Sequence, residues 1–68
     1  MKAVSGKKFA KIIEKKGWFL KHIKGSHHVY MKEGNNARIS IPIHGNQSLK
    51  IGLQKNLMKI AGLVESEI

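Results

Sequence analysis

Apolar residues recur at helical spacing near the beginning of the chain. Phe9, Ile12 and Ile13 stand at positions i, i+3 and i+4, with lysines at many of the surrounding positions, which is typical of a helix with one apolar face. Ser5 precedes this stretch, and its hydroxyl can accept a hydrogen bond from an amide of the first turn. The pattern predicts an amphipathic helix from Gly6 to Lys16.

The middle of the chain changes to the pattern of β-strands. Aromatic and β-branched residues predict three strands, which cover Trp18 to Lys24, His27 to Glu33 and Ala37 to Ile41. Gly25-Ser26 and Gly34-Asn35-Asn36 separate the strands, and both segments are rich in residues that tolerate turn conformations. Pro42 has no amide hydrogen to donate, so the third strand should end there. The three strands are expected to form an antiparallel meander with two hairpins.

Alternation along the second strand assigns its side chains to two faces. Tyr30 shares one face with His28 and Lys32, and Val29 lies on the other face. We therefore expect Tyr30 to be the exposed aromatic ring, able to stack on a nucleobase. Trp18, which directly follows Gly17 after the first predicted helix, is expected to fill the core.

A second helical pattern lies near the end of the chain. Leu53, Leu57 and Ile60 form one apolar stripe, and Gly62 is suited to end a helix. This pattern predicts a helix that begins at Leu49 or Lys50 and ends at Ala61. The predicted order is α-β-β-β-α, and the fold class is α+β, with two helices packed on one face of a three-stranded antiparallel sheet.

Length and composition limit the kind of protein this is. A chain of 68 residues makes one small domain, so residues 1–68 are expected to fold together. The chain has no cysteine, so neither disulfides nor a thiolate metal site can stabilise it, and a cytoplasmic location is expected. The stretch from Met1 to Lys16 has no uninterrupted apolar run, so neither a signal peptide nor a membrane span is predicted.

Positive charge is concentrated in the first half of the chain. The net charge is +9, and residues 1–36 carry nine lysines against two glutamates. Such asymmetry indicates one basic face, for which nucleic acid is the commonest partner. The alternative is a lysine-rich solvated surface that has no ligand.

The segment Gly25-Ser26-His27-His28 is the strongest candidate for chemistry. Imidazole can both accept and donate a proton near neutral pH, which suits general acid–base catalysis. Gly25 and Ser26 in the turn are small, so they would let a substrate backbone approach closely. His27 and His28 are neighbours and cannot share one face of a strand, so either one could be the catalytic residue.

Lysine side chains near this turn could hold the phosphates of a nucleic acid. Lys24 is the best placed of them, and Lys21, Lys32 and Arg38 are further candidates. A metal site is the rival explanation for four histidines, but the chain has only four acidic residues and its histidines are poorly spaced for zinc. No metal or other cofactor is therefore expected.

Several short motifs follow one another nearly from end to end of the chain. They are Gly17-Trp18, Lys24-Gly25-Ser26-His27-His28, Ile39-Ser40-Ile41-Pro42, His44, Leu49-Lys50-Ile51-Gly52-Leu53 and Lys59-Ile60-Ala61-Gly62-Leu63. In this order and spacing, they resemble the HicA toxins, also called the YcfA-like family, of bacterial and archaeal toxin–antitoxin systems.

The resemblance implies a fold like that of the double-stranded-RNA-binding domain and an activity as a metal-independent ribonuclease on messenger RNA. In such toxins the histidine of the Gly-Ser-His motif is catalytic, which points to His27 here, with His28 as the alternative. It also implies a HicB-type antitoxin that binds the toxin and covers the active site.

We therefore expect an endoribonuclease, an mRNA interferase that arrests translation by cutting mRNA. The expected RNA-binding residues are Lys24, Lys21, Lys32, Arg38 and Tyr30. The alternative is a non-catalytic RNA-binding module, since the same fold and charge can recognise the shape of RNA without any histidine.

Overall fold

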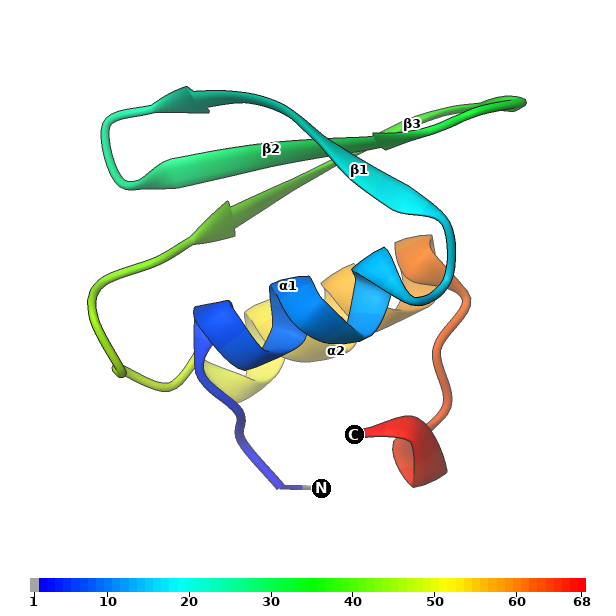
Figure 1. Cartoon of the computed structure of the whole chain (residues 1–68). Helices are drawn as coiled ribbons and strands as arrows, with labels where there is room; N and C mark the ends of the chain where they lie inside the picture. Colours follow the sequence, from blue (N-terminus) through cyan, green and yellow to red (C-terminus); the bar gives the residue numbers. More distant parts are fainter. Residues whose placement is uncertain (1) are drawn as a thin grey trace.

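The computed structural model describes residues 2–68, and its element order is the predicted α-β-β-β-α followed by one short 3-10 helix. The elements are α1 (Gly6–Glu14), β1 (Trp18–Lys24), β2 (His27–Lys32), β3 (Asn35–Pro42), α2 (Ile51–Ala61) and η1 (Glu65–Glu67). The two helices lie side by side on one face of the sheet (Figure 1). The predicted α+β class and its layer arrangement are confirmed.

The helix ends follow local chemistry. Ser5 caps α1 as predicted, because its hydroxyl accepts a hydrogen bond of 3.1 Å from the amide of Lys8. The helix ends at Glu14, two residues before the predicted end, because the chain already turns over 15–17. The second helix starts at Ile51, and its N-cap residue, Lys50, offers no side-chain hydrogen bond.

The sheet is an antiparallel meander with β2 in the centre. Directly paired residues on neighbouring strands share a face. Ile39 and Ile41 are buried against the helices, whereas Arg38 and Ser40 are exposed on the opposite side. We call that opposite side, which the helices do not cover, the open face.

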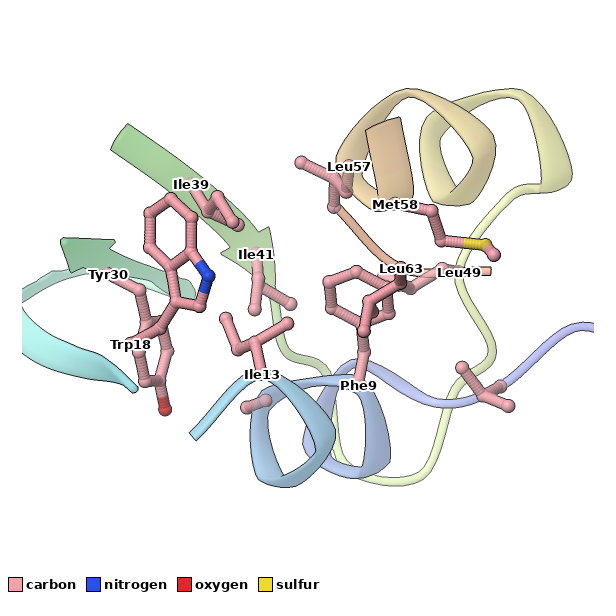
Figure 2. Close-up of a cluster of buried hydrophobic side chains, with 12 residues drawn as sticks. Phe9, Ile13, Trp18, Tyr30, Ile39, Ile41, Leu49, Leu57, Met58 and Leu63 are labelled. Atoms are coloured by element: carbon pink, nitrogen blue, oxygen red, sulfur yellow. The ribbon is translucent and has the colours of Figure 1, made fainter. Parts of the chain in front are cut away.

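The core fills the space between the sheet and the two helices (Figure 2). Phe9 and Ile13 of α1 and Ile39 and Ile41 of β3 are fully buried. Trp18 is buried as predicted. Burial of these side chains is the main favourable contribution to folding, at about 1.5–3 kcal/mol for each large apolar residue.

The prediction that Tyr30 is an exposed stacking ring is wrong. Only 4% of Tyr30 is exposed, and its ring lies beside Trp18 in the core (Figure 2). Its hydroxyl donates a hydrogen bond of 3.3 Å to Oε2 of Glu14. Burial, followed by the negative charge of Glu14, raises the pKa of Tyr30 above its ordinary value. The residue therefore packs the sheet against α1 and cannot stack on a nucleobase.

Gln54 is a buried polar residue in the middle of α2, and none of its surface is exposed. Its Oε1 accepts a hydrogen bond of 2.9 Å from the amide of Val4, and its Nε2 donates one of 2.8 Å to the carbonyl of Lys2. These bonds compensate for removing the amide from water. They tie the segment before α1 to α2, and nothing in the helical pattern predicts them.

Gly6 marks a close approach between the start of α1 and the end of β3. A Cβ atom at this position would overlap the carbonyl oxygen of Pro42 and would lie 3.0 Å from Cγ1 of Ile43. Only glycine permits this contact. The contact fixes the end of β3, which pairs with the beginning of β2.

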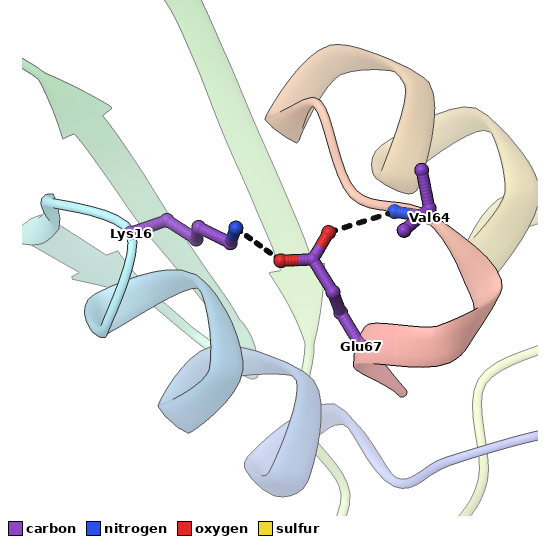
Figure 3. A network of polar contacts seen from close by, with 3 residues as sticks. All are labelled: Lys16, Val64 and Glu67. Carbon is purple, nitrogen blue, oxygen red and sulfur yellow. Dashed lines mark hydrogen bonds and ion pairs between the residues drawn. The ribbon is translucent and has the colours of Figure 1, made fainter.

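Glu67 connects η1 to the turn that follows α1. Its carboxylate forms an ion pair with Nζ of Lys16, and its Oε1 accepts a hydrogen bond of 3.0 Å from the amide of Val64 (Figure 3). Lys16 first, and the Val64 amide second, hold the pKa of the Glu67 carboxyl below its ordinary value of 4.5.

This lowered pKa gives Glu67→Gln an expected pH dependence. A carboxylate with a lowered pKa stabilises the fold above pH 4.5, and that contribution is lost as the pH falls through the folded-state value. Glu67→Gln should therefore unfold at lower urea than the wild type at pH 7, and the difference should shrink at pH 3. Urea midpoints at both pH values measure it. A difference that is the same at pH 3 and pH 7 would contradict this role for the ion pair.

Candidate nucleic-acid interface

The turn between β1 and β2 has two residues, Gly25 and Ser26, and it presents the start of β2 at one end of the sheet. Gly25 has φ +60°, which suits the first central position of a type II′ hairpin turn. The carbonyl of Ser26 accepts a hydrogen bond of 2.8 Å from the amide of Ile43. The chain leaving β3 thus holds the turn, and the backbone on both sides of His27 is fixed.

The open face is built from three rows of paired residues. From the turn inward, the rows are Lys24–His27–Pro42, His22–Val29–Ser40 and Phe19–Met31–Arg38. The irregularity between Leu20 and His22 shifts the register of β1 and returns His22 and Lys24 to this face. The strands β1, β2 and β3 contain no acidic residue, so the open face combines imidazoles, cations and apolar side chains.

His27 is exposed on the open face, next to Lys24. Its Nδ1 lies 3.5 Å from Oγ of Ser40, at the long end of hydrogen-bond range, and the tautomer decides which group donates. If Nδ1 carries the proton and donates to Ser40, Nε2 is left free to accept a proton. Sequence analysis did not single out Ser40, although alternation along β3 places it on the same side as Arg38.

His28 points toward the opposite side of the sheet. Its paired residues are Ile23 on β1 and Ile41 on β3, and Ile41 belongs to the core. His28 is half-buried there. The two neighbouring histidines therefore lie on different faces, and only His27 lies on the open face with Lys24.

The four cations predicted to bind RNA are not all in one place. Lys24 is in the His27 row, and Arg38 is on the open face two rows further along. Lys21 is exposed at the irregularity in β1. Lys32 shares the helix-facing side with Tyr30, and five residues at about 3.3 Å each separate it from His27. Lys32 is thus not part of the group around His27.

A hollow of about 270 Å³ opens beside the end of β3 and is lined by Pro42, Leu49 and Leu53 among others, but His27 does not line it. Within residues 2–68, no three His, Cys, Asp or Glu side chains gather closely enough to hold a metal ion. Among the helices of that part of the chain, none is long and apolar enough to cross a membrane.

Comparison with known proteins gives one result. The model of the family described as the HicA toxin of bacterial toxin–antitoxin systems matches residues 6–63. No curated protein matches the chain. The matched residues run from the start of α1 to just beyond the end of α2 and so include the whole sheet. Because this match covers most of the 68 residues, the chain belongs to the HicA toxin family of bacterial toxin–antitoxin systems.

Proposed function

We propose that this toxin is a metal-independent endoribonuclease that binds messenger RNA on the open face, cuts it and so arrests translation in the cytoplasm. One observation carries the proposal: His27 is exposed beside Lys24 on a face whose strands contain no acidic residue. A cationic face attracts the phosphate backbone. An exposed imidazole on that face supplies the proton transfer that cleavage of RNA requires.

The reaction uses the nucleophile that RNA itself carries. His27 Nε2 takes the proton of a 2′-hydroxyl, and the 2′-oxygen forms a bond to the adjacent phosphorus. The bond between phosphorus and the 5′-oxygen breaks, and the leaving oxygen takes up a proton. The products carry a 2′,3′-cyclic phosphate and a 5′-hydroxyl. Lys24 stabilises the negative charge that develops on the phosphoryl oxygens.

The position of His28 favours His27 as the base. A substrate on the open face lies on the other side of the sheet from His28, which is half-buried between Ile23 and Ile41. His27 also has a neighbour, Ser40, that can hold its ring in a productive tautomer. We therefore assign the proton transfer to His27 and treat Ser40 as a positioning residue.

The test of the proposed function is direct. Purified protein is incubated with a single-stranded transcript in excess EDTA, and the RNA is resolved on a denaturing gel. The proposal predicts fragments that accumulate with time. A mobility shift on a native gel with no fragments on the denaturing gel would support the non-catalytic RNA-binding module instead.

Lys24 is expected to contribute through its charge. Each phosphate contact that is lost lowers the slope of log affinity against log salt by about one. Lys24→Ala should therefore bind a single-stranded RNA more weakly than the wild type and with a flatter salt dependence. Lys55→Ala, on the exposed side of α2, is the matched control and should leave the slope unchanged. An unaltered slope in Lys24→Ala would remove this lysine from the interface.

A toxin of this kind has an antitoxin partner, and we propose that a HicB-type antitoxin covers the open face. Two observations support this location. Strand β1 is an edge of the sheet, and its Phe19 exposes 49% of its surface; exposed sheet edges and apolar side chains are commonly covered by another chain. Phe19 also lies on the same face as His27, so a protein bound there would exclude RNA.

A further inference from the structure

Cleavage by the proposed route needs two proton transfers, and His27 accounts for one of them. A base removes the proton of the 2′-hydroxyl, and an acid protonates the 5′-oxygen as it leaves. His28 cannot supply the second proton from the other side of the sheet. A side chain that acts as this acid therefore has to lie on the open face with His27.

His22 is on the open face, in the row next to that of His27. It pairs with Val29, whereas His27, two residues before Val29 on β2, pairs with Lys24. His22 and His27 are thus diagonal neighbours on adjacent strands. Such pairs lie about 7–8 Å apart, within reach of long and aromatic side chains, which leaves room for one phosphate between two imidazole rings.

The surroundings of His22 also suit this role. The side chain is exposed, so it is free to meet a substrate. Lys24, two residues further along β1, lies on the same face and pairs with His27. A phosphate held by Lys24 would therefore be close to both histidines. Of the four histidines in the chain, only His22 and His27 belong to the paired rows of this face.

We propose that His22 is a second catalytic residue, the general acid that protonates the leaving 5′-oxygen. This inference rests on the proposed ribonuclease function. The 2′-oxygen–phosphorus bond forms as the proton of the 2′-hydroxyl passes to His27. The phosphorus–5′-oxygen bond breaks as the imidazolium of His22 gives its proton to the 5′-oxygen. Exchange of protons with water then returns both rings to their starting states.

The experiment uses two substrates of the same sequence. One is ordinary RNA, and the other has sulfur in place of the 5′-oxygen at the cleavage site. A thiolate leaves without being protonated, because a thiol is a far stronger acid than an alcohol. On ordinary RNA, His22→Ala should be slower than the wild type by about 10²–10⁴-fold, the usual contribution of a general acid. On the sulfur substrate it should cut nearly as fast as the wild type.

The controls separate this role from folding and from binding. His27→Ala should stay slow on both substrates, because the 2′-hydroxyl still needs a base. His44→Ala removes an exposed imidazole outside the three rows and should cut both substrates like the wild type. His22→Gln keeps a polar side chain that cannot transfer a proton, and it should behave like His22→Ala.

The cleavage rates on the two substrates decide whether His22 is the general acid. If His22→Ala cuts ordinary RNA at the wild-type rate, or is equally slow on both substrates, His22 is not the acid and the role of His27 still stands. If the wild type cuts neither substrate, the ribonuclease function fails and this inference fails with it.

Discussion

Replacing His27 with Ala is expected to slow cleavage of a single-stranded transcript by about 10²–10⁴-fold, which is the usual contribution of one general acid or base. The exposed side chain makes few packing contacts, so the variant should fold like the wild type. Its affinity for RNA should be nearly unchanged, because Lys24 and Arg38 remain on the open face. Single-turnover cleavage and RNA binding, measured on the same preparations, test all three statements.

His28→Ala is the matched comparison for this prediction. It removes the neighbouring imidazole from the opposite side of the sheet. At a temperature where both variants are folded, His28→Ala should retain a cleavage rate within a few-fold of the wild type. Wild-type rates in His27→Ala together with a large loss in His28→Ala would reverse the assignment of the base.

Replacing Tyr30 with Ala is expected to have the largest effect on stability. Truncation of a buried aromatic side chain to Ala costs about 3–5 kcal/mol. A domain of this size is stable by only about 0.05–0.15 kcal/mol per residue, so much of the protein should be unfolded at 37 °C. Thermal unfolding followed by circular dichroism measures the change. A ring that stacks on RNA from the surface would give the opposite result: normal stability and weaker RNA binding.

Tyr30→Phe refines this second prediction. The variant keeps the ring in the core and removes only the hydroxyl that donates to Glu14. A typical hydrogen bond contributes about 0.5–1.5 kcal/mol, so the loss should be much smaller than in Tyr30→Ala. Cleavage by Tyr30→Phe should equal that of the wild type. A loss of cleavage in a folded Tyr30→Phe would give the hydroxyl a role in the site that its buried position does not suggest.

The sequence predicts most of the fold because the spacing of apolar residues and the positions of the capping and turn residues indicate the same helices and strands. Both bounds of β1, the Ser5 cap of α1 and the end of α2 before Gly62 match the structure. The error about Tyr30 has a physical cause. Alternation divides a strand into two faces but does not say which one is covered. The hydroxyl of Tyr30 can be buried because Glu14, sixteen residues earlier, accepts its hydrogen bond.

The candidate site could be predicted only in part. The turn motif and the closeness of Lys24 to His27 follow from the local sequence, because a two-residue turn pairs the residues on either side of it. The local sequence does not show whether His27 or His28 is the catalytic residue, because that depends on which face of the sheet the helices cover. Ser40 and His22 were missed as neighbours of His27 because they reach it through the register of two different hairpins.

The chemistry of the cut ends tests the central claim most directly. Fragments made by the wild-type protein in excess EDTA are analysed for the groups at their new 5′ and 3′ ends. Proton transfer by His27 on a 2′-hydroxyl predicts a 5′-hydroxyl and a 2′,3′-cyclic phosphate, or the monophosphate formed when that ring opens. It also predicts no cut at a phosphate whose preceding ribose lacks the 2′-hydroxyl. Ends with a 5′-phosphate and a 3′-hydroxyl, or cutting at the deoxyribose position, would contradict it.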